Sequence, residues 1–191
     1  MPIQKIDLRP GVNRENTRYT NEGGWWESDK VRFRQGNPEK IGGWQRLTAD
    51  TFLGVCRSLF NWNDLGGTDL LGVGTNLKFY LYTGGTYNDI TPIRATTTDG
   101  ITFSASNGSA VITATDNAHG AFVGDFVTFA QAVSLGGNIT AAVLNKEYQI
   151  ASVPSADTFT FVATATANAS DSGNGGSGAD AVYQINTGAE T

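Results

Sequence analysis

Cysteine and histidine are almost missing from this chain of 191 residues, which contains one of each. The lone Cys56 excludes a disulfide within the chain, and its place in the apolar-rich run FLGVCRSLF predicts a buried, unreactive thiol. The lone His119 lies in a predicted turn, where we expect it to hydrogen-bond Asp116 or Asp125. Because metal sites need several converging ligands, neither residue predicts a metal site.

Charged residues are also scarce, at 16% of the chain, and the hydrophobic fraction of 39% is somewhat low for a globular protein. Glycine is abundant instead, with 24 residues, and Thr, Ser, Asn and Ala fill much of the remainder. This composition favours short strands and tight turns over helices. No run of about 18 apolar residues occurs, so we predict no membrane-spanning helix. The N-terminal sequence MPIQKIDLRPG lacks the apolar core of a signal peptide.

Motifs for catalysis and cofactor binding are missing as well. Gly72 and Gly74 lack the third glycine and the following helix of a dinucleotide-binding loop. There is no Walker lysine phrase and no serine elbow. No pair of carboxylates is singled out for glycoside cleavage, although spacing alone does not exclude one. We therefore predict that the chain is not an enzyme and has no catalytic residues, no cofactor and no metal.

What the chain does contain is an aromatic and charged stretch at residues 21–44, NEGGWWESDKVRFRQGNPEKIGGW. Glycines precede its VRFRQ segment and Gly-Asn-Pro follows it, so we predict one short strand bounded by turns. Alternation places Val31 and Phe33 on an apolar face, with Lys30, Arg32 and Arg34 on a cationic face. That cationic face is either solvated, with local partners, or bound to something anionic. The local candidates are Glu27, Asp29 and Glu39.

The four tryptophans allow three interpretations: a sugar-stacking platform, burial in the core, or anchors of a subunit contact. They are Trp25, Trp26, Trp44 and Trp62. We expect Trp26 and Trp44 to pack on the strands that they flank. Adjacent residues on a strand point to opposite faces, so either Trp25 or Trp26 is left for a subunit contact.

Short β-rich runs follow one another between residues 52 and 90: FLGVCRSLFNW, DLLGVGTN and KFYLYTGGTYNDI. Asn, Asp and Gly residues separate them, which predicts an antiparallel meander with turns near residues 63–67, 75–76 and 84–85. Upstream, we predict a short strand at 3–8 and an extended arm at 12–20. Such a sheet exposes its edges and needs closure or repetition to hide them.

The charge balance changes abruptly after the meander. Residues 1–94 carry 12 Lys and Arg against 10 Asp and Glu, whereas residues 95–191 carry 1 against 8, so the formal charge falls from +2 to −7. This shift predicts a boundary near residues 91–95. Beyond it we predict strands at 110–115, 125–130, 147–153 and 158–162, one helical turn within 140–146, a flexible turn or linker at 168–178, and a return strand at 181–186.

Three phrases in order, PGVNRE, GGWWESDKVRFRQGNPEKIGGW and GVGTNLKFYLYTGGTYNDITP, resemble the N-terminal part of tail hub or nozzle proteins of short-tailed bacteriophages. This family, also called packaged-DNA stabilisation proteins, builds a β-propeller, and its copies form a ring beneath the portal and adaptor. The resemblance spans about residues 2–94, and the GTNLKFYLY…YNDITP segment looks like a propeller blade phrase. Residues 110–163 look like a small β-barrel module inserted in phage tail and adhesin proteins.

The resemblance implies an all-β fold, in which an antiparallel meander like a propeller blade carries an inserted small β-barrel or sandwich. We predict an N-terminal arm and first strands at 1–94, the inserted domain at 95–180 and a return strand at 181–191. One blade cannot close a propeller, which needs at least about four. We therefore expect the chain to continue in a longer protein.

The implied function is that of a structural virion protein, made in the host cytoplasm and located in the tail, that extends the DNA channel and helps retain and conduct the genome. The implied partners are further copies in a ring, the portal, the adaptor and other tail proteins. Non-specific contact with viral DNA is open, since Lys and Arg bind phosphates without reading sequence. A tail-associated adhesin that binds a receptor glycan is the alternative. The residues predicted to form subunit interfaces are Trp25, Trp26, Lys30, Arg32, Arg34, Lys40, Arg14 and Arg18.

Overall fold

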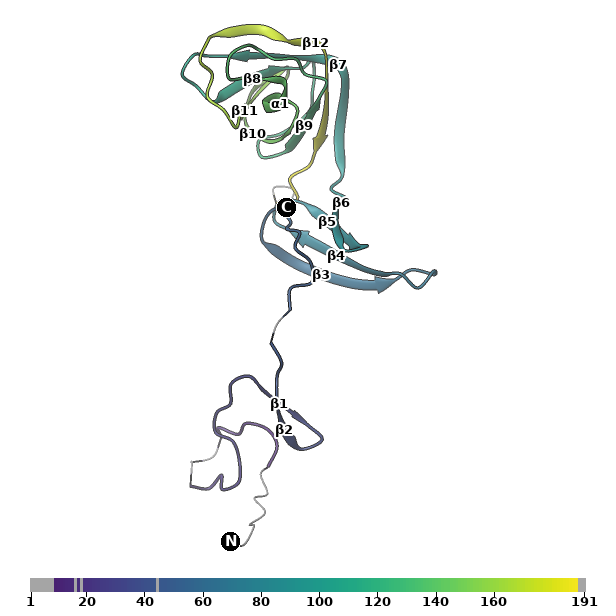
Figure 1. The fold of residues 1–191 in the computed structure, drawn as a ribbon, viewed down its shortest axis with the longest axis vertical. Coiled ribbons are helices and arrows are strands. Elements are labelled where there is room, and N and C mark those ends of the chain that lie inside the picture. The colour runs from purple at the N-terminus through teal and green to yellow at the C-terminus, as the bar shows by residue number, and fades with distance from the viewer. Residues whose placement is uncertain (1–8, 16, 18, 44, 189–191) are drawn as a thin grey trace. The chain divides into compact units, whose positions relative to one another are not determined.

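The regular secondary structure of the described residues consists of antiparallel β-strands and one short helix, as a computed structural model shows (Figure 1). The structure describes residues 9–15, 17, 19–43 and 45–188, with the backbone alone at 172–174, 176 and 177. Residues 1–47 form one compact unit and residues 48–191 form a second. The predicted all-β class is confirmed. The strand predicted at 3–8 lies outside the described residues.

The first unit contains a hairpin of β1 (Val31–Arg34) and β2 (Asn37–Lys40). Its two-residue turn has positive φ at both positions, 49° at Gln35 and 82° at Gly36, which matches the right-handed twist of the flanking strands. Val31 and Phe33 are half-buried while Arg32 and Arg34 are exposed, so the predicted strand and its alternation are confirmed.

The second strand of this hairpin was not predicted from the sequence, because Pro38 was interpreted as part of a turn. Pro38 lies opposite Phe33 in the register of the hairpin. A proline cannot donate a ladder hydrogen bond, yet a strand at the edge of a sheet tolerates it. The hairpin has only two strands, so both are edges.

A four-stranded meander begins the second unit, with its strands in sequence order β3-β4-β5-β6. The strands are β3 (Cys56–Asn63), β4 (Asp69–Thr75), β5 (Phe79–Thr83) and β6 (Thr86–Asp89). All three strand pairs are antiparallel, and the turns fall where Asn, Asp and Gly separate the apolar runs. The predicted meander is confirmed.

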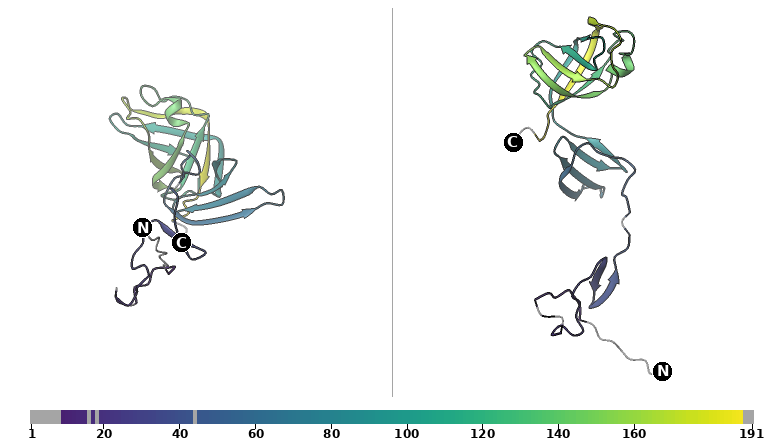
Figure 2. Two further views of the ribbon diagram at one scale, coloured as in Figure 1. Left: turned by 60° about the horizontal axis from the view of Figure 1, so that its bottom comes forward. Right: turned by 90° about the vertical axis from the view of Figure 1, so that its left-hand side faces the viewer.

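The remaining strands close into a six-stranded barrel in the order β10-β11-β8-β7-β12-β9 (Figure 2). Its elements are β7 (Ile93–Ala105), β8 (Val111–Thr115), β9 (Phe126–Ala130), α1 (Ala141–Leu144), β10 (Glu147–Ser155), β11 (Thr158–Val162) and β12 (Asp171–Gln184). The four strands predicted between 110 and 162 are confirmed. So is the single helical turn, whose N-cap Thr140 accepts a hydrogen bond from the Val143 N–H.

The barrel interior is filled mainly by aromatic side chains. Phe129 contacts three other buried phenylalanine rings, with centroids 4.9 Å from Phe103, 5.2 Å from Phe161 and 6.2 Å from Phe159. Each of these side chains is at most 2% exposed. Alternation along each strand directs these residues inward, and the resulting core belongs to the barrel alone.

The prediction of a flexible linker at 168–178 is wrong, because β12 begins at Asp171 and pairs with β7 across several bulges. The glycines serve close packing here. A Cβ at Gly175, which has φ of 96°, would lie 2.4 Å from the Phe103 ring. Only glycine therefore lets the backbone of β12 approach that ring.

Strands β7 and β12 carry the chain into and out of the barrel beside the meander. They pair from Asp171↔Ala105 to Gln184↔Ile93 and run through residues 94–95 and 180–181 without a break. The division of the chain at those two points stays a prediction.

Lys78 ties the meander to the barrel from a buried position. Its side chain is 1% exposed, and its ammonium group donates to Asp89 Oδ2 on β6 at 2.7 Å, to Gln184 Oε1 on β12 at 2.9 Å and to the Glu147 carboxylate on β10. The nitrogen also lies 4.7 Å from the centroid of the Phe126 ring on β9. One cation thus satisfies acceptors from three strands, two of which, β10 and β12, are remote in sequence.

A second group of contacts surrounds the same junction. Arg94 Nε lies 2.8 Å from Asp125 Oδ2. The other carboxylate oxygen of Asp125, Oδ1, accepts a hydrogen bond from the Asn186 N–H at 3.0 Å. The Thr187 hydroxyl donates to the Thr75 carbonyl at 3.0 Å and its N–H donates to the Leu77 carbonyl at 3.2 Å. The chain that leaves β12 is therefore fastened directly to the β4–β5 turn.

Ionisation of the junction follows from burial and pairing together. Burial lowers the pKa of Lys78, but the hydrogen bonds to Asp89 and Glu147 outweigh it and raise the pKa above its ordinary value. Burial raises the pKa of Asp89, but hydrogen bonds from Lys78 and Thr91 outweigh it and leave the pKa below its ordinary value. Both groups are therefore charged at neutral pH.

Removing the two acids should cost more stability than removing the lysine. In the D89N/E147Q variant a buried ammonium keeps only neutral acceptors, which should lower the free energy of unfolding by about 3–5 kcal/mol. In K78M the partly exposed carboxylates regain water, so about 1–3 kcal/mol should be lost. Urea unfolding at pH 7 measures both, with exposed Lys146→Met as the matched control. Equal stability of D89N/E147Q and wild type would contradict the junction.

Acid should weaken the junction through Asp89. Because its folded pKa is depressed, its stabilisation is present above the unfolded value of about 3.9 and is lost as pH falls through the folded pKa. Lys78 has the opposite dependence on pH. Because its folded pKa is raised, its contribution to stability is fully present below the unfolded value of about 10.4 and is lost as the pH rises through the folded pKa. Melting temperatures between pH 2 and 7 should show a wild-type advantage over D89N that shrinks below about pH 4. A constant difference at every pH would refute this role of Asp89.

Candidate functional site

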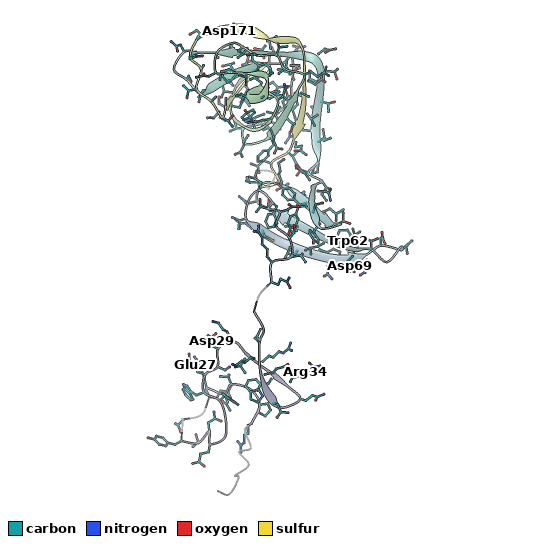
Figure 3. The ribbon with its side chains drawn as sticks, in the orientation of Figure 1. Glu27, Asp29, Arg34, Trp62, Asp69 and Asp171 are labelled. Carbon is teal, nitrogen blue, oxygen red and sulfur yellow. The ribbon has the colours of Figure 1, made fainter. Side chains whose placement is uncertain are left out.

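The residues predicted to contact other subunits all belong to the first unit. Of these, Arg18 lies outside the described residues, as does Trp44. The remaining seven surround the β1–β2 hairpin and the loop before it, and they are Arg14, Trp25, Trp26, Lys30, Arg32, Arg34 and Lys40. Figure 3 marks Arg34 together with the neighbouring acids Glu27 and Asp29. Their proposed role at interfaces stays a prediction.

Two of these arginines have local carboxylate partners. Arg32 Nε lies 3.0 Å from Glu39 Oε2 across the hairpin, and Arg14 Nη2 lies 3.6 Å from Glu27 Oε1. Arg14 Nε also donates to the Trp26 carbonyl at 3.2 Å. All four side chains are exposed. The expectation of a local partner for the cationic face of the strand is confirmed for Arg32, whereas the Arg14–Glu27 pair was not predicted.

Three cations of the hairpin have no such partner. Lys30, Arg34 and Lys40 are exposed, and no ion pair joins any of them to another residue that the structure describes. Lys30 has φ of 55°, so the chain bends sharply as it enters β1. Their charges are available to an acidic partner.

Trp25 and Trp26 are both half-buried. The Trp25 ring meets Phe33 edge-on, with centroids 5.9 Å apart, and the Trp25 backbone forms a parallel bridge with Val12. Its indole Nε1 is buried without a hydrogen-bond partner in the described part of the chain. Both tryptophans line a pocket of about 450 Å³ together with Asn21, Gly24 and Glu27.

One side of the four-stranded sheet is an exposed aromatic surface, which we call the aromatic face: Phe60, Trp62 and Phe79. Phe60 and Trp62 are 69% and 37% exposed, and their centroids lie 5.6 Å apart. Cross-strand register places Phe60 opposite Gly72, and Gly74 opposite Phe79. Figure 3 marks Trp62 near the end of β3.

Two glycines of β4 make the aromatic face possible. A Cβ at Gly72 would lie 3.2 Å from the Trp62 ring, and one at Gly74 would lie 3.4 Å from the Phe79 ring and 2.4 Å from the Ser58 hydroxyl. Without side chains at these positions, the rings lie directly against the β4 backbone. The rings of Trp62 and Phe79 therefore pack close to the sheet, and their outer surfaces are exposed to solvent.

The opposite side of the sheet is partly covered by the segment before β3. The Phe52 ring lies 5.1 Å from Tyr87 and 6.0 Å from Tyr80, and the Leu53 N–H donates to the Tyr80 hydroxyl at 3.1 Å. Burial raises the pKa of Tyr80, so its hydroxyl stays protonated at neutral pH. The two sides of the sheet therefore differ in how much of their apolar surface is covered.

The predicted burial of Cys56 is wrong. Cys56 is a free, exposed cysteine at the start of β3, and all eight residues of that strand are exposed. An apolar run predicts burial when a strand has neighbours on both sides, whereas β3 is an edge strand with an open surface. The sequence contained no signal that separates these cases.

The predicted partners of His119 are also wrong. The ring is buried, its Nδ1 accepts the Ala121 N–H at 3.0 Å, and it stacks on Tyr183 with centroids 6.0 Å apart. Asp116 instead accepts from the Tyr183 hydroxyl at 2.5 Å and from the Thr97 hydroxyl at 2.7 Å. Burial and this carboxylate raise the pKa of Tyr183, which keeps it a hydrogen-bond donor.

Within the residues that the structure describes, no group of three or more His, Cys, Asp or Glu side chains is arranged to hold a metal ion. No helix in the same part of the chain has the length and apolarity needed to cross a membrane. The predictions of no catalytic residue and no cofactor stay predictions.

Comparisons with known proteins show a weak structural likeness and no family. No protein-family model matches the sequence. No curated protein matches it either. Among solved structures, a chain described as phage phi92 endosialidase is similar at 21% identity with a TM-score of 0.38. The likeness covers 80% of this chain but 21% of that protein, and a likeness this weak assigns neither a family nor an activity.

Truncating the hairpin arginines should leave the hairpin folded. Arg32→Ala removes an exposed ion pair, so the opening free energy of β1 and β2 should fall by no more than about 1 kcal/mol. Phe33→Ala removes the ring that packs on Trp25 and should cost more. Hydrogen–deuterium exchange of the hairpin amides compares the two variants. A larger effect of Arg32→Ala than of Phe33→Ala would show that the arginine is structural.

Proposed function

We propose that this chain is a structural virion protein, a subunit of a phage tail hub or nozzle that extends the DNA channel below portal and adaptor and helps retain and conduct the genome. Copies of the chain form a ring and contact the portal, the adaptor and other tail proteins. The ordered phrases of residues 2–94, which resemble that family, support this assignment. The fold is compatible with it, because the meander has the four antiparallel strands of a propeller blade.

The observation that carries the proposal is the open surface of the meander. Its edge strand β3 is exposed along all eight residues, and the aromatic face is exposed at Phe60, Trp62 and Phe79. An exposed apolar edge strand and a contiguous aromatic surface are features of protein-binding surfaces. A subunit of a large assembly has such surfaces because neighbouring chains cover them.

The unpaired cations of the hairpin fit contacts between subunits better than contacts with DNA. Lys30, Arg34 and Lys40 offer charge to carboxylates at an interface, where arginine forms two-pronged hydrogen bonds. Strongly cationic walls would slow DNA that slides through a channel, since Lys and Arg bind its phosphates. The near-neutral charge of residues 1–94 agrees with this choice.

The alternative function, a tail-associated adhesin, is supported by one specific observation. The pocket beside Trp25 and Trp26 combines two indole rings with the amide of Asn21 and the carboxylate of Glu27. Aromatic faces and adjacent polar groups are the elements of a site for a sugar ring. This alternative predicts glycan binding by the isolated chain.

Electron cryo-microscopy of virions that contain this chain tests the proposed function. We expect density for several copies in a ring coaxial with the portal and the tail channel. The β1–β2 hairpin should lie at contacts between subunits. A peripheral position at fibre tips would contradict the hub assignment.

Glycan binding separates the two functions. We expect the purified chain to bind no glycan on an array of bacterial surface saccharides. The adhesin alternative instead predicts binding that Trp26→Ala reduces at least tenfold and that Trp62→Ala, a control in the other unit, leaves unchanged. That pattern would overturn the hub assignment in favour of the adhesin.

A further inference from the structure

The outer edge of β3 is an unprotected pairing site. No described strand pairs with that edge, because β3 is the first strand of the sheet and its partner β4 occupies the other side. Leu59 and Phe60 at its centre are 64% and 69% exposed. Edge strands are usually protected by Lys, Pro or a central bulge. The strand has no Lys or Pro, and its one register shift lies near its start, between Cys56 and Ser58.

Charges at the two ends of β3 are opposite in sign. Arg57, near the start, is the only charged residue of the strand, and no ion pair joins it to another described residue. Asp64 follows the end of the strand, and Asp69 lies opposite Asn63 on β4. The structure thus places one cation at the start of β3 and two carboxylates at its end.

Antiparallel pairing of two such strands makes these charges complementary. The start of each strand then lies beside the end of the other, so each Arg57 meets the acids of the other copy. A parallel pairing would bring like charges together at both ends. The charge pattern therefore selects a second copy of the same strand in the antiparallel direction.

We propose that β3 pairs with β3 of a second copy about a two-fold axis at Phe60, joining two four-stranded sheets into one of eight strands. In this register Phe60 lies opposite its counterpart, Leu59 lies opposite Asn61 and Arg57 lies opposite Asn63. Each Arg57 is then next to Asp64, and the Asn63 that it faces is itself opposite Asp69 on β4. An axis at Leu59 would move Arg57 opposite Asn61, farther from both acids.

The pairing affects both the open edge of β3 and the aromatic face. It satisfies the open backbone groups of both edges, and it brings the aromatic faces of both copies to one side as a continuous strip. A two-fold contact closes on two copies and cannot propagate around a ring. The inference therefore goes beyond the proposed function: it describes the free chain before assembly, and it holds or fails independently of the hub.

A charge exchange between two variants tests the pairing. We expect multi-angle light scattering to give a dimer for wild type at tens of micromolar. Arg57→Glu places like charges at both ends and should give a monomer. A second variant, Asp64→Asn with Asp69→Lys, should do the same, since the asparagine keeps an acceptor for the Thr68 N–H of the turn.

Mixing the two charge variants should restore the dimer. In the mixed pair, the glutamate introduced at position 57 of one copy faces the lysine introduced at position 69 of the other, and the unchanged Arg57 faces the unchanged acids. The control Lys146→Glu changes another exposed cation, on the barrel, and should leave the wild-type dimer intact. A monomeric wild type, or Arg57→Glu that dimerises as well as wild type, would overturn the proposal.

Disulfide cross-linking tests the register. In a Cys56→Ser background, Phe60→Cys places two thiols directly across the axis, where opposed Cβ atoms lie about 4.5–5.5 Å apart. Leu59→Cys places them on a diagonal, about 7–8 Å apart. We expect Phe60→Cys to form the intermolecular disulfide at least tenfold faster, with circular dichroism confirming that both variants fold. Faster cross-linking of Leu59→Cys would overturn the proposed axis.

Discussion

A single buried ammonium group joins the two parts of the larger unit. Lys78 leaves the β4–β5 turn and reaches acceptors on β6, β10 and β12. A charge is stable in such a position only when its partners are fixed around it, because burial without them costs several kcal/mol. The meander and the barrel are therefore held in one arrangement by the requirement to satisfy this group. The contacts of Arg94 and Thr187 reinforce the same arrangement.

The barrel and the meander differ in how completely their own residues pair the sheet edges and cover the apolar surface. The barrel closes on its own strands, which removes every sheet edge and encloses a core of aromatic rings. The meander has two edges, and it presents an exposed strand and an exposed aromatic face. An isolated open sheet of this kind is incomplete in the same sense as one blade of a propeller. We therefore expect contacts with other chains at the meander and the hairpin rather than at the barrel.

Local sequence patterns were sufficient to locate most strands. Alternation identified β1 through Val31 and Phe33, and turn residues located the meander. The same reasoning failed where an apolar or glycine-rich segment has a non-local environment. Cys56 is exposed because β3 is an edge, and residues 171–178 form a strand because β7 lies beside them.

The buried lysine could not have been found from the sequence. Its partners Glu147 and Gln184 lie 69 and 106 residues away, and no local pattern relates them. The charge change near residue 95 contained no indication that one cation connects the meander to the barrel. The hairpin residues were found by their chemistry, whereas the role proposed for them depends on surfaces of other chains.

Backbone exchange of β3 tests most directly whether this chain is a subunit whose open sheet is covered on assembly. Hydrogen–deuterium exchange of residues 56–63 would be compared in the virion and in the free chain, at a concentration where light scattering gives the monomer mass. We predict that the outward amides of β3 exchange rapidly in the monomer and at least a hundredfold more slowly in the particle. Equal exchange in both states would show that the edge stays open, and would contradict the assignment as an assembly subunit.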